Sequence, residues 1–160
     1  MTKITFITVG KLKEQYFRDA VSEYTKRLSK YTKFEIIEIH DEPLSEKMSL
    51  AREQTILRKE GERILKNIKE SGYVIITAIS GTMLNSTAFA EKITKLALEG
   101  HSHIYFIIGG SLGLSLEVVE RADFSLSFSK MTFPHQLMRV ILAEQVYRAF
   151  RINNNEPYHK

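Results

Sequence analysis

The spacing of hydrophobic residues along this chain switches repeatedly between two periods, which predicts alternating strands and helices. Short apolar or alternating runs are typical of strands, and apolar residues three or four positions apart are typical of helices. The predicted strands are residues 4–9, 34–39, 73–79, 103–108 and 124–128, and the predicted helices are residues 12–31, 46–69, 87–98, a short segment ending at 118, and 136–152. This order favours an α/β fold with helices flanking a mostly parallel sheet, in a single domain over residues 1–160.

In three of these segments the pattern also predicts where the strand or helix lies in the fold. Residues 73–79 are almost continuously apolar, as in a strand buried on both faces, and Ser80-Gly81 is expected to end it. Residues 34–39 interleave apolar and acidic positions, which favours a sheet edge. The last helix, 136–152, is apolar on two sides, so a second surface should cover the outer one. We expect a homodimer with this helix at its interface, the alternative being a helix that is simply central.

Composition narrows the class of protein. The chain has 160 residues, 43% of them hydrophobic, which is enough for one well-filled core. Its N-terminus lacks the features of a signal peptide, and no apolar run approaches the ~20 residues that a membrane helix needs. There is no cysteine, so disulfides and thiolate chemistry are excluded, and the five histidines lack the spacing of a metal site. A cytoplasmic protein without membrane or metal is therefore expected.

The distribution of charge is more informative than the net charge of +4. Residues 1–33 carry eight Lys and Arg against three acids, and residues 130–160 carry five against two, whereas the middle of the chain is acidic. Folding could gather the two basic ends into one positive face, which would attract a polyanion such as RNA. For residues 11–33 alone, an ordinary solvated helix surface is an equally good explanation.

Two loops are candidates for binding a ligand. Gly109 to Gly113 (GGSLG) follows a predicted buried strand and lets the backbone approach a ligand closely, although it is neither a dinucleotide-binding fingerprint nor a P-loop. Residues 129–135 (SKMTFPH) offer backbone donors and acceptors of the kind that can bind adenine. Because ligands of open α/β sheets bind beyond the carboxyl ends of strands, we expect these loops to share one pocket with the end of strand 73–79.

Several side chains near the C-terminus could act chemically. His135 would begin the last helix, where the helix dipole favours the neutral imidazole that a base requires; a capping or positioning role is an equal alternative. Arg139 lies one turn further on and should point the same way. Tyr158 and His159 could stack on and hydrogen-bond an RNA base, unless they belong to a frayed terminus.

These segments together resemble the RlmH family, also called YbeA-like, of bacterial ribosomal RNA methyltransferases of the SPOUT class. The resemblance covers the whole chain and rests on KITFITVGKLKE at the start, IIGGSLGL at 107–114, and FSLSFSKMTFPHQLMRVILAEQVYRAFRINNNEPYHK at 124–160. It implies an α/β fold with a C-terminal trefoil knot and a homodimer. It also implies S-adenosylmethionine as methyl donor, and methylation of N3 of a pseudouridine in large-subunit rRNA of the assembled ribosome.

The resemblance also implies roles for particular residues. The cofactor positions of the family fall on Thr77, where the family has leucine, and on Gly109, Phe128, Ser129, Lys130, Met131, Thr132 and Phe133. The positions that handle the substrate fall on His135, Arg139, Tyr158 and His159. In this scheme His135 or His159 would accept the N3 proton and Arg139 would stabilise charge on the base carbonyls. The rival functions are a ribosome-binding protein without catalysis and a related methyltransferase acting on tRNA.

Overall fold

The computed structural model describes all residues, 1–160, and its five strands form one sheet. The strands are β1 (Lys3–Val9), β2 (Lys33–Ile39), β3 (Tyr73–Met83), β4 (His103–Ile108) and β5 (Phe124–Ser127), in the order β2-β1-β4-β3-β5. The helices are α1 (Gln15–Leu28), α2 (Leu50–Lys66), α3 (Ser86–Leu98), α4 (Leu116–Arg121) and α5 (His135–Asn153). Every neighbouring pair of strands is parallel, so the predicted α/β fold with flanking helices is confirmed.

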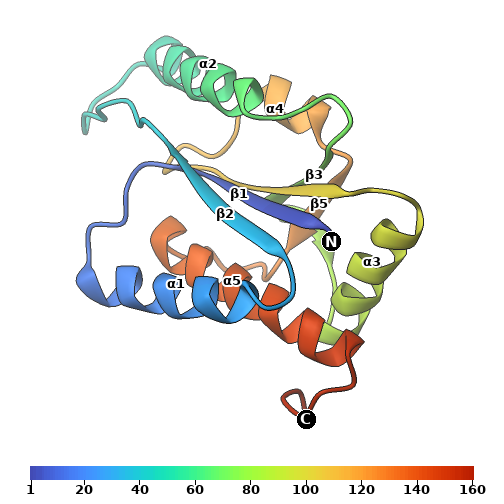
Figure 1. Cartoon of the computed structure of the whole chain (residues 1–160). Coiled ribbons are helices and arrows are strands. Elements are labelled where there is room, and N and C mark those ends of the chain that lie inside the picture. The colour runs from blue at the N-terminus through green and yellow to red at the C-terminus, as the bar shows by residue number, and fades with distance from the viewer.

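The helices cover the two faces of the sheet in separate layers (Figure 1). α2 and α4 lie together on one face, and α1, α5 and α3 lie side by side on the other, with α5 in the middle. Each layer closes over its own cluster of buried apolar side chains, centred on Phe6 and Phe106 under α5 and on Ile7 and Ile107 under α2. The alternation of side chains along β1 and β4 is what supplies both clusters. β2 is at a sheet edge, as its mixed pattern predicts.

The first two helices are shorter than the periodicity predicts. α1 begins at Gln15 rather than at residue 12, because the backbone of the preceding loop is used elsewhere: the N–H of Lys13 donates to the Gln136 side chain, and the Lys13 carbonyl accepts from Arg18. α2 begins at Leu50 rather than at residue 46, where Ser49 accepts the N–H of Arg52 as an N-cap. Leu50, the first residue of α2, is 72% exposed.

The expectation that Ser80-Gly81 ends the third strand is wrong. β3 continues to Met83, and its pairing with β5 shifts so that both Thr77 and Thr82 lie opposite Leu126. The glycine is needed for close approach, because a Cβ at Gly81 would lie 2.8 Å from the backbone of Ser125. A glycine in a strand thus marks a bulge against a neighbouring strand here.

Neighbouring helices bury part of each of the two apolar sides of α5. α1 packs against one flank and α3 against the other, and Leu142, Ala143, Val146 and Ala149 are completely or almost completely buried. Leu137, Val140 and Ile141 remain only half-buried. A central position therefore accounts for much of the pattern, and these half-buried side chains are left partly uncovered by the chain itself.

Candidate functional site

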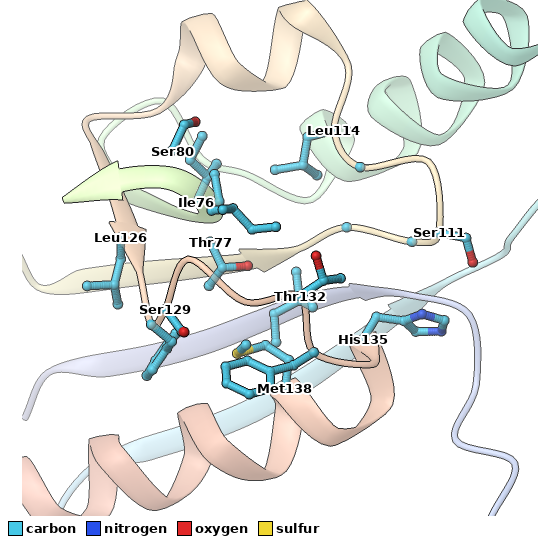
Figure 2. A pocket seen from close by; sticks show the side chains of 18 of the residues that line it. Ile76, Thr77, Ser80, Ser111, Leu114, Leu126, Ser129, Thr132, His135 and Met138 are labelled. Atoms are coloured by element: carbon cyan, nitrogen blue, oxygen red, sulfur yellow. The ribbon is translucent and has the colours of Figure 1, made fainter. Parts of the chain in front are cut away.

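Strand β3 and two loops at the carboxyl ends of neighbouring strands line a cavity of about 610 Å³ (Figure 2). Its walls come from the second half of β3, from the glycine loop after β4, and from the loop between β5 and α5. β3 pairs with both β4 and β5, which brings the three chain segments together although up to about 50 residues separate them. The expected pocket at the strand ends is therefore present. Its volume lies in the ~300–1,000 Å³ range of small-molecule sites.

Most of the residues expected to bind the cofactor line this cavity. They are Thr77, Gly109, Phe128, Ser129, Met131, Thr132 and Phe133. Lys130 is the exception: it does not line the cavity and it is exposed to solvent. The hydroxyl of Thr77 donates a hydrogen bond to the carbonyl of Ile107 at 3.1 Å, which fixes the position of this side chain. A leucine in its place would lose this bond between β3 and β4.

The glycine loop forms one wall because its backbone folds back on itself. The N–H of Gly113 donates to the carbonyl of Gly110 at 3.1 Å, and Gly113 has a φ of +86° that L side chains rarely adopt. A Cβ at Gly109 would lie 2.6 Å from the carbonyl oxygen of Gly113. Both glycines are therefore required by the turn, in which the Gly113 backbone and the Leu114 side chain lie directly against Gly109.

The loop after β5 presents free backbone donors to the cavity. The hydroxyl of Ser129 accepts the N–H of Met131 at 3.0 Å, and the Ser129 carbonyl accepts the Ser127 hydroxyl at 3.1 Å. The N–H groups of Thr132 and Phe133 form no hydrogen bond within the chain. Such a braced loop can hydrogen-bond the edge of a planar base, while Phe128 and Met138 supply apolar contacts beside it. This donor set fits an adenine nucleoside.

His135 lies at the rim of the cavity, at the first residue of α5 (Figure 2). Burial lowers the pKa of its imidazole below the usual 6.5, and the positive charge of Arg139 and Lys13 acts in the same direction, against Asp41. The helix N-terminus disfavours imidazolium as well. His135 is therefore neutral near pH 7 and able to accept a proton.

Arg139 does not face this cavity. It is 1% exposed, pairs with Glu38 of β2 at 2.6 Å, and donates to the carbonyls of Val9 and Gly10 at the end of β1. Although it is one turn from His135, its guanidinium thus fastens α5 to the sheet. The expectation that its side chain points the same way as that of His135 is therefore wrong, and its role in the reaction stays a prediction.

Tyr158 and His159 do not line this cavity, but His159 lines a second cavity that shares Leu126 and Phe128 with it. The Tyr158 hydroxyl donates to Glu144 at 3.1 Å, and Nδ1 of His159 lies 3.1 Å from the Arg148 guanidinium. The tail is therefore docked on α5 and is not frayed. Glu144 and Arg148 follow His135 by 9 and 13 residues on α5, so at a rise of ~1.5 Å per residue they are about 14 and 20 Å from it along the helix axis. One chain does not bring His135 and the tail together.

Other cavity residues were not anticipated from the sequence. Leu114 and Val119 cover the cavity from the α4 side, and Met138 covers it from α5. The apolar residues that follow the glycine loop were a usable signal for the first two. The direction of Met138 depends on how α5 packs on the sheet, and the local pattern does not specify that.

Replacing Gly109 with alanine should abolish binding of an adenine nucleoside without unfolding the protein. The added Cβ would lie 2.6 Å from the carbonyl oxygen of Gly113, which is backbone, and 3.0 Å from the Leu114 side chain, so the loop itself must move. We expect at least a tenfold loss of affinity by calorimetric titration. Gly100→Ala is a control elsewhere on the surface, where a Cβ meets nothing within 4 Å although φ is +90°. Equal affinity of Gly109→Ala and the unmodified chain would contradict this role.

The structure contains neither a cluster of metal-binding side chains nor a helix that could span a membrane. No group of three or more His, Asp and Glu side chains converges in a way that could hold a metal ion. None of the helices is both long and apolar enough to cross a membrane.

Known proteins are similar to this chain in sequence and in fold. A family model described as "Predicted SPOUT methyltransferase" matches residues 2–159. A protein named ribosomal RNA large subunit methyltransferase H from Bifidobacterium adolescentis is 59% identical over 158 residues, covering 99% of each chain. One of the same name from Clostridium acetobutylicum is 59% identical over 157 residues, covering 98% of this chain and 99% of the relative.

Two solved structures show the same fold at low sequence identity. Methyltransferase Lpg2936 of Legionella pneumophila, with bound cofactor SAM, superposes with a TM-score of 0.51 at 12% identity over 93% of this chain and 66% of its own length. The tRNA (m1G37) methyltransferase of Aquifex aeolicus superposes with a TM-score of 0.52 at 16% identity over 92% of this chain and 70% of that one. From the family match over nearly the whole sequence and the two relatives at 59% identity, the chain belongs to the SPOUT methyltransferase family.

Proposed function

We propose that this protein transfers a methyl group from S-adenosylmethionine to N3 of a pseudouridine in large-subunit rRNA of the assembled ribosome. The observation that carries the proposal is the cavity with its braced donor loop and with a neutral histidine at its rim. The relatives named large subunit rRNA methyltransferase H support the class of RNA. The pseudouridine, its N3 atom and the assembled ribosome are implied by the resemblance. A ribosomal substrate would place the protein in the cytoplasm.

The residues of the cavity fit S-adenosylmethionine. Its adenine would bind the free backbone N–H groups of Thr132 and Phe133. Its ribose and sulfonium would pass along the glycine loop, where Gly109 and Gly110 line the cavity. The apolar lining keeps water from the reacting carbon, which favours transfer to RNA over loss to solvent.

His135 is the best-placed residue to take up a proton. S-adenosylmethionine supplies a methyl group already activated by the positive sulfur, so the protein must mainly align the nucleophile and accept the N3 proton. The lowered pKa of His135 keeps its imidazole ready to accept that proton at neutral pH. Arg139 would act at a distance in this scheme, by holding the first turns of α5 and thus the position of His135 against the sheet.

RNA binding is supported by the position of the two basic ends of the sequence. α1 and α5 pack side by side, and the guanidinium groups of Arg27 and Arg151 lie 5.6 and 5.9 Å from the ring of Tyr147. Several of these cations are paired with acids, including Arg27 with Glu23 and Arg151 with Glu156. The free positive charge of one chain is therefore small, and two chains would present more of it to rRNA.

We also infer the homodimer and the trefoil knot. β5 lies at the sheet edge beyond β3, whereas Arg139 of α5 bonds to the end of β1. The connecting loop must therefore cross the ends of β3 and β4 beside the glycine loop, which is the path that a knotted C-terminus requires. A second copy would cover the half-buried face of α5. It would also allow Tyr158 and His159 of one chain to reach the cavity of the other.

The proposed function can be tested by incubating the purified protein with labelled S-adenosylmethionine and either intact 70S ribosomes, isolated large subunits, free rRNA or tRNA. We expect labelling of 70S ribosomes alone, with mass spectrometry placing one methyl group on N3 of a pseudouridine. Gly109→Ala should not label. Labelling of tRNA would favour the tRNA-modifying alternative. Binding to ribosomes without any methyl transfer would favour a protein without catalysis.

Mixing two inactive variants tests the shared site. His135→Ala and His159→Ala chains, unfolded and refolded together, should regain up to about a quarter of the original activity, because some mixed dimers combine an intact His135 with an intact His159. Each variant refolded alone is the control. Mixed chains that stay as inactive as the separate variants, although native mass spectrometry detects mixed dimers, would show that the tail does not act across the interface.

A further inference from the structure

We propose that Glu60 binds the α-ammonium group of the amino-acid portion of the cofactor, from a small second cavity that adjoins the first. This inference rests on the proposed function, because it assumes that S-adenosylmethionine occupies the larger cavity. It assigns a role to a buried carboxylate of α2, an element that none of the expected cofactor positions includes.

The second cavity continues the first one past its rim. It has a volume of about 40 Å³ and is lined by Glu60, Asp41 and Glu42 together with Gly110, Ser111 and His135. Gly110, Ser111 and His135 also line the larger cavity, and Figure 2 shows Ser111 and His135 at the same side of it. The two cavities therefore meet at these three residues, and the amino-acid portion of a ligand in the larger cavity would extend past the glycine loop into the smaller one.

Two glycines bring the Glu60 carboxylate to this place. A Cβ at Gly61 would lie 2.3 Å from the Ser115 hydroxyl, so the missing side chain lets α2 pack directly on the start of α4. A Cβ at Gly110 would lie 3.8 Å from Oε1 of Glu60, so the carboxylate lies against the glycine loop with no side chain in between. The close packing of α2 and the open loop together direct the carboxylate toward the cofactor.

Glu60 has an unused oxygen and no cation of its own. It is 6% exposed; its Oε2 accepts the N–H of Glu42 at 3.2 Å, and its Oε1 forms no hydrogen bond within the chain. The nearby Arg63 is engaged by Glu42 and by the carbonyl of His40. A buried carboxylate without a counter-ion is costly, and burial raises the pKa of Glu60 accordingly. A bound ammonium would supply the missing charge.

The same edge of the cavity also offers hydrogen-bond donors for the α-carboxylate of the amino-acid portion. The backbone N–H groups of Ser111 and Leu112 donate to no group of the chain. A carboxylate can accept from such adjacent N–H groups of a tight turn. An acceptor for an ammonium and two donors for a carboxylate therefore lie side by side, which is the pattern that an α-amino acid requires. A metal fits less well, because Arg63 already occupies Glu42.

The test compares ligands with and without the amino-acid portion. S-adenosylhomocysteine and 5′-methylthioadenosine share the adenosine and the sulfur, but only the first carries the ammonium. In calorimetric titrations we expect Glu60→Gln to lower affinity for S-adenosylhomocysteine and S-adenosylmethionine about tenfold, as for loss of a hydrogen bond between charged groups, and affinity for methylthioadenosine less than twofold. Glu62→Gln, the same change at an exposed position of α2, should alter none of them.

A second measurement uses the unmodified chain, so that the proposal can be tested even if Glu60→Gln folds poorly. The analogue of S-adenosylhomocysteine in which hydrogen replaces the α-amino group should bind about tenfold more weakly than the parent compound. Equal affinity of these two compounds, or an equal loss for all ligands in Glu60→Gln, would overturn the role of Glu60. Failure of the unmodified chain to bind any of these adenosine compounds would instead overturn the proposed cofactor.

Discussion

Replacing His135 with alanine is expected to lower the rate of methyl transfer by a factor of about 10²–10⁴, the range for loss of one general base. The imidazole is the titratable group at the rim of the cavity whose lowered pKa suits it to accept the N3 proton. Affinity for S-adenosylmethionine should change little, since the adenine donors belong to the loop before it. Single-turnover methylation of ribosomes, with cofactor binding measured in parallel, separates the two effects.

The same assignment of His135 as the base predicts how the rate of methyl transfer changes with pH. The base must be unprotonated, and burial places the pKa of His135 below 6.5, so the rate should be level near pH 7 and fall as the pH drops through that lowered pKa. The acid limb should disappear in His135→Ala. His40→Ala, at an exposed histidine, should leave both rate and profile unchanged. A near-normal rate for His135→Ala, or an acid limb that persists in it, would mean that the proton leaves by another route.

Replacing Arg139 with methionine is expected to lower the free energy of unfolding by about 3 kcal/mol, because it leaves the carbonyls of Val9 and Gly10 without their buried donor. Methionine keeps much of the volume, so a cavity contributes little. The lost ion pair should add only a small amount, since the Glu38 side chain is 37% exposed and can be hydrated. Urea unfolding followed by circular dichroism measures the change.

A control and a second measurement distinguish the structural role of Arg139 from a role in the reaction. Arg58→Met, at an exposed arginine of α2, should change the free energy of unfolding by less than about 0.5 kcal/mol. Methyl transfer by Arg139→Met well below its unfolding temperature should fall less than that of His135→Ala. Unchanged stability together with a loss of rate as large as for His135→Ala would show that Arg139 acts directly on the substrate.

The sequence predicted the site better than it predicted individual side chains. The glycines at 109–113 and the loop 129–135 are recognisable because each follows a short apolar strand, and the parallel order of the fold then places both at the same edge. The bulge at Gly81 was mistaken for a strand end, because a glycine that interrupts a strand and a glycine that allows close approach leave the same local pattern. Only the neighbouring Ser125 distinguishes them.

Local periodicity by itself determined that the chain forms five strands and five helices, with its polar loops at the strand ends, because each choice depends on residues a few positions apart. Tertiary structure decided what those elements place together. β3 lies between β4 and β5, and this order closes the cavity. Arg139 turns toward Glu38 and does not line the cavity, and Glu60 reaches the glycine loop because Gly61 lets α2 pack on α4. These outcomes depend on contacts between segments about 20 to 130 residues apart in the sequence. The pattern of residues within any one segment does not reveal the energies of such contacts.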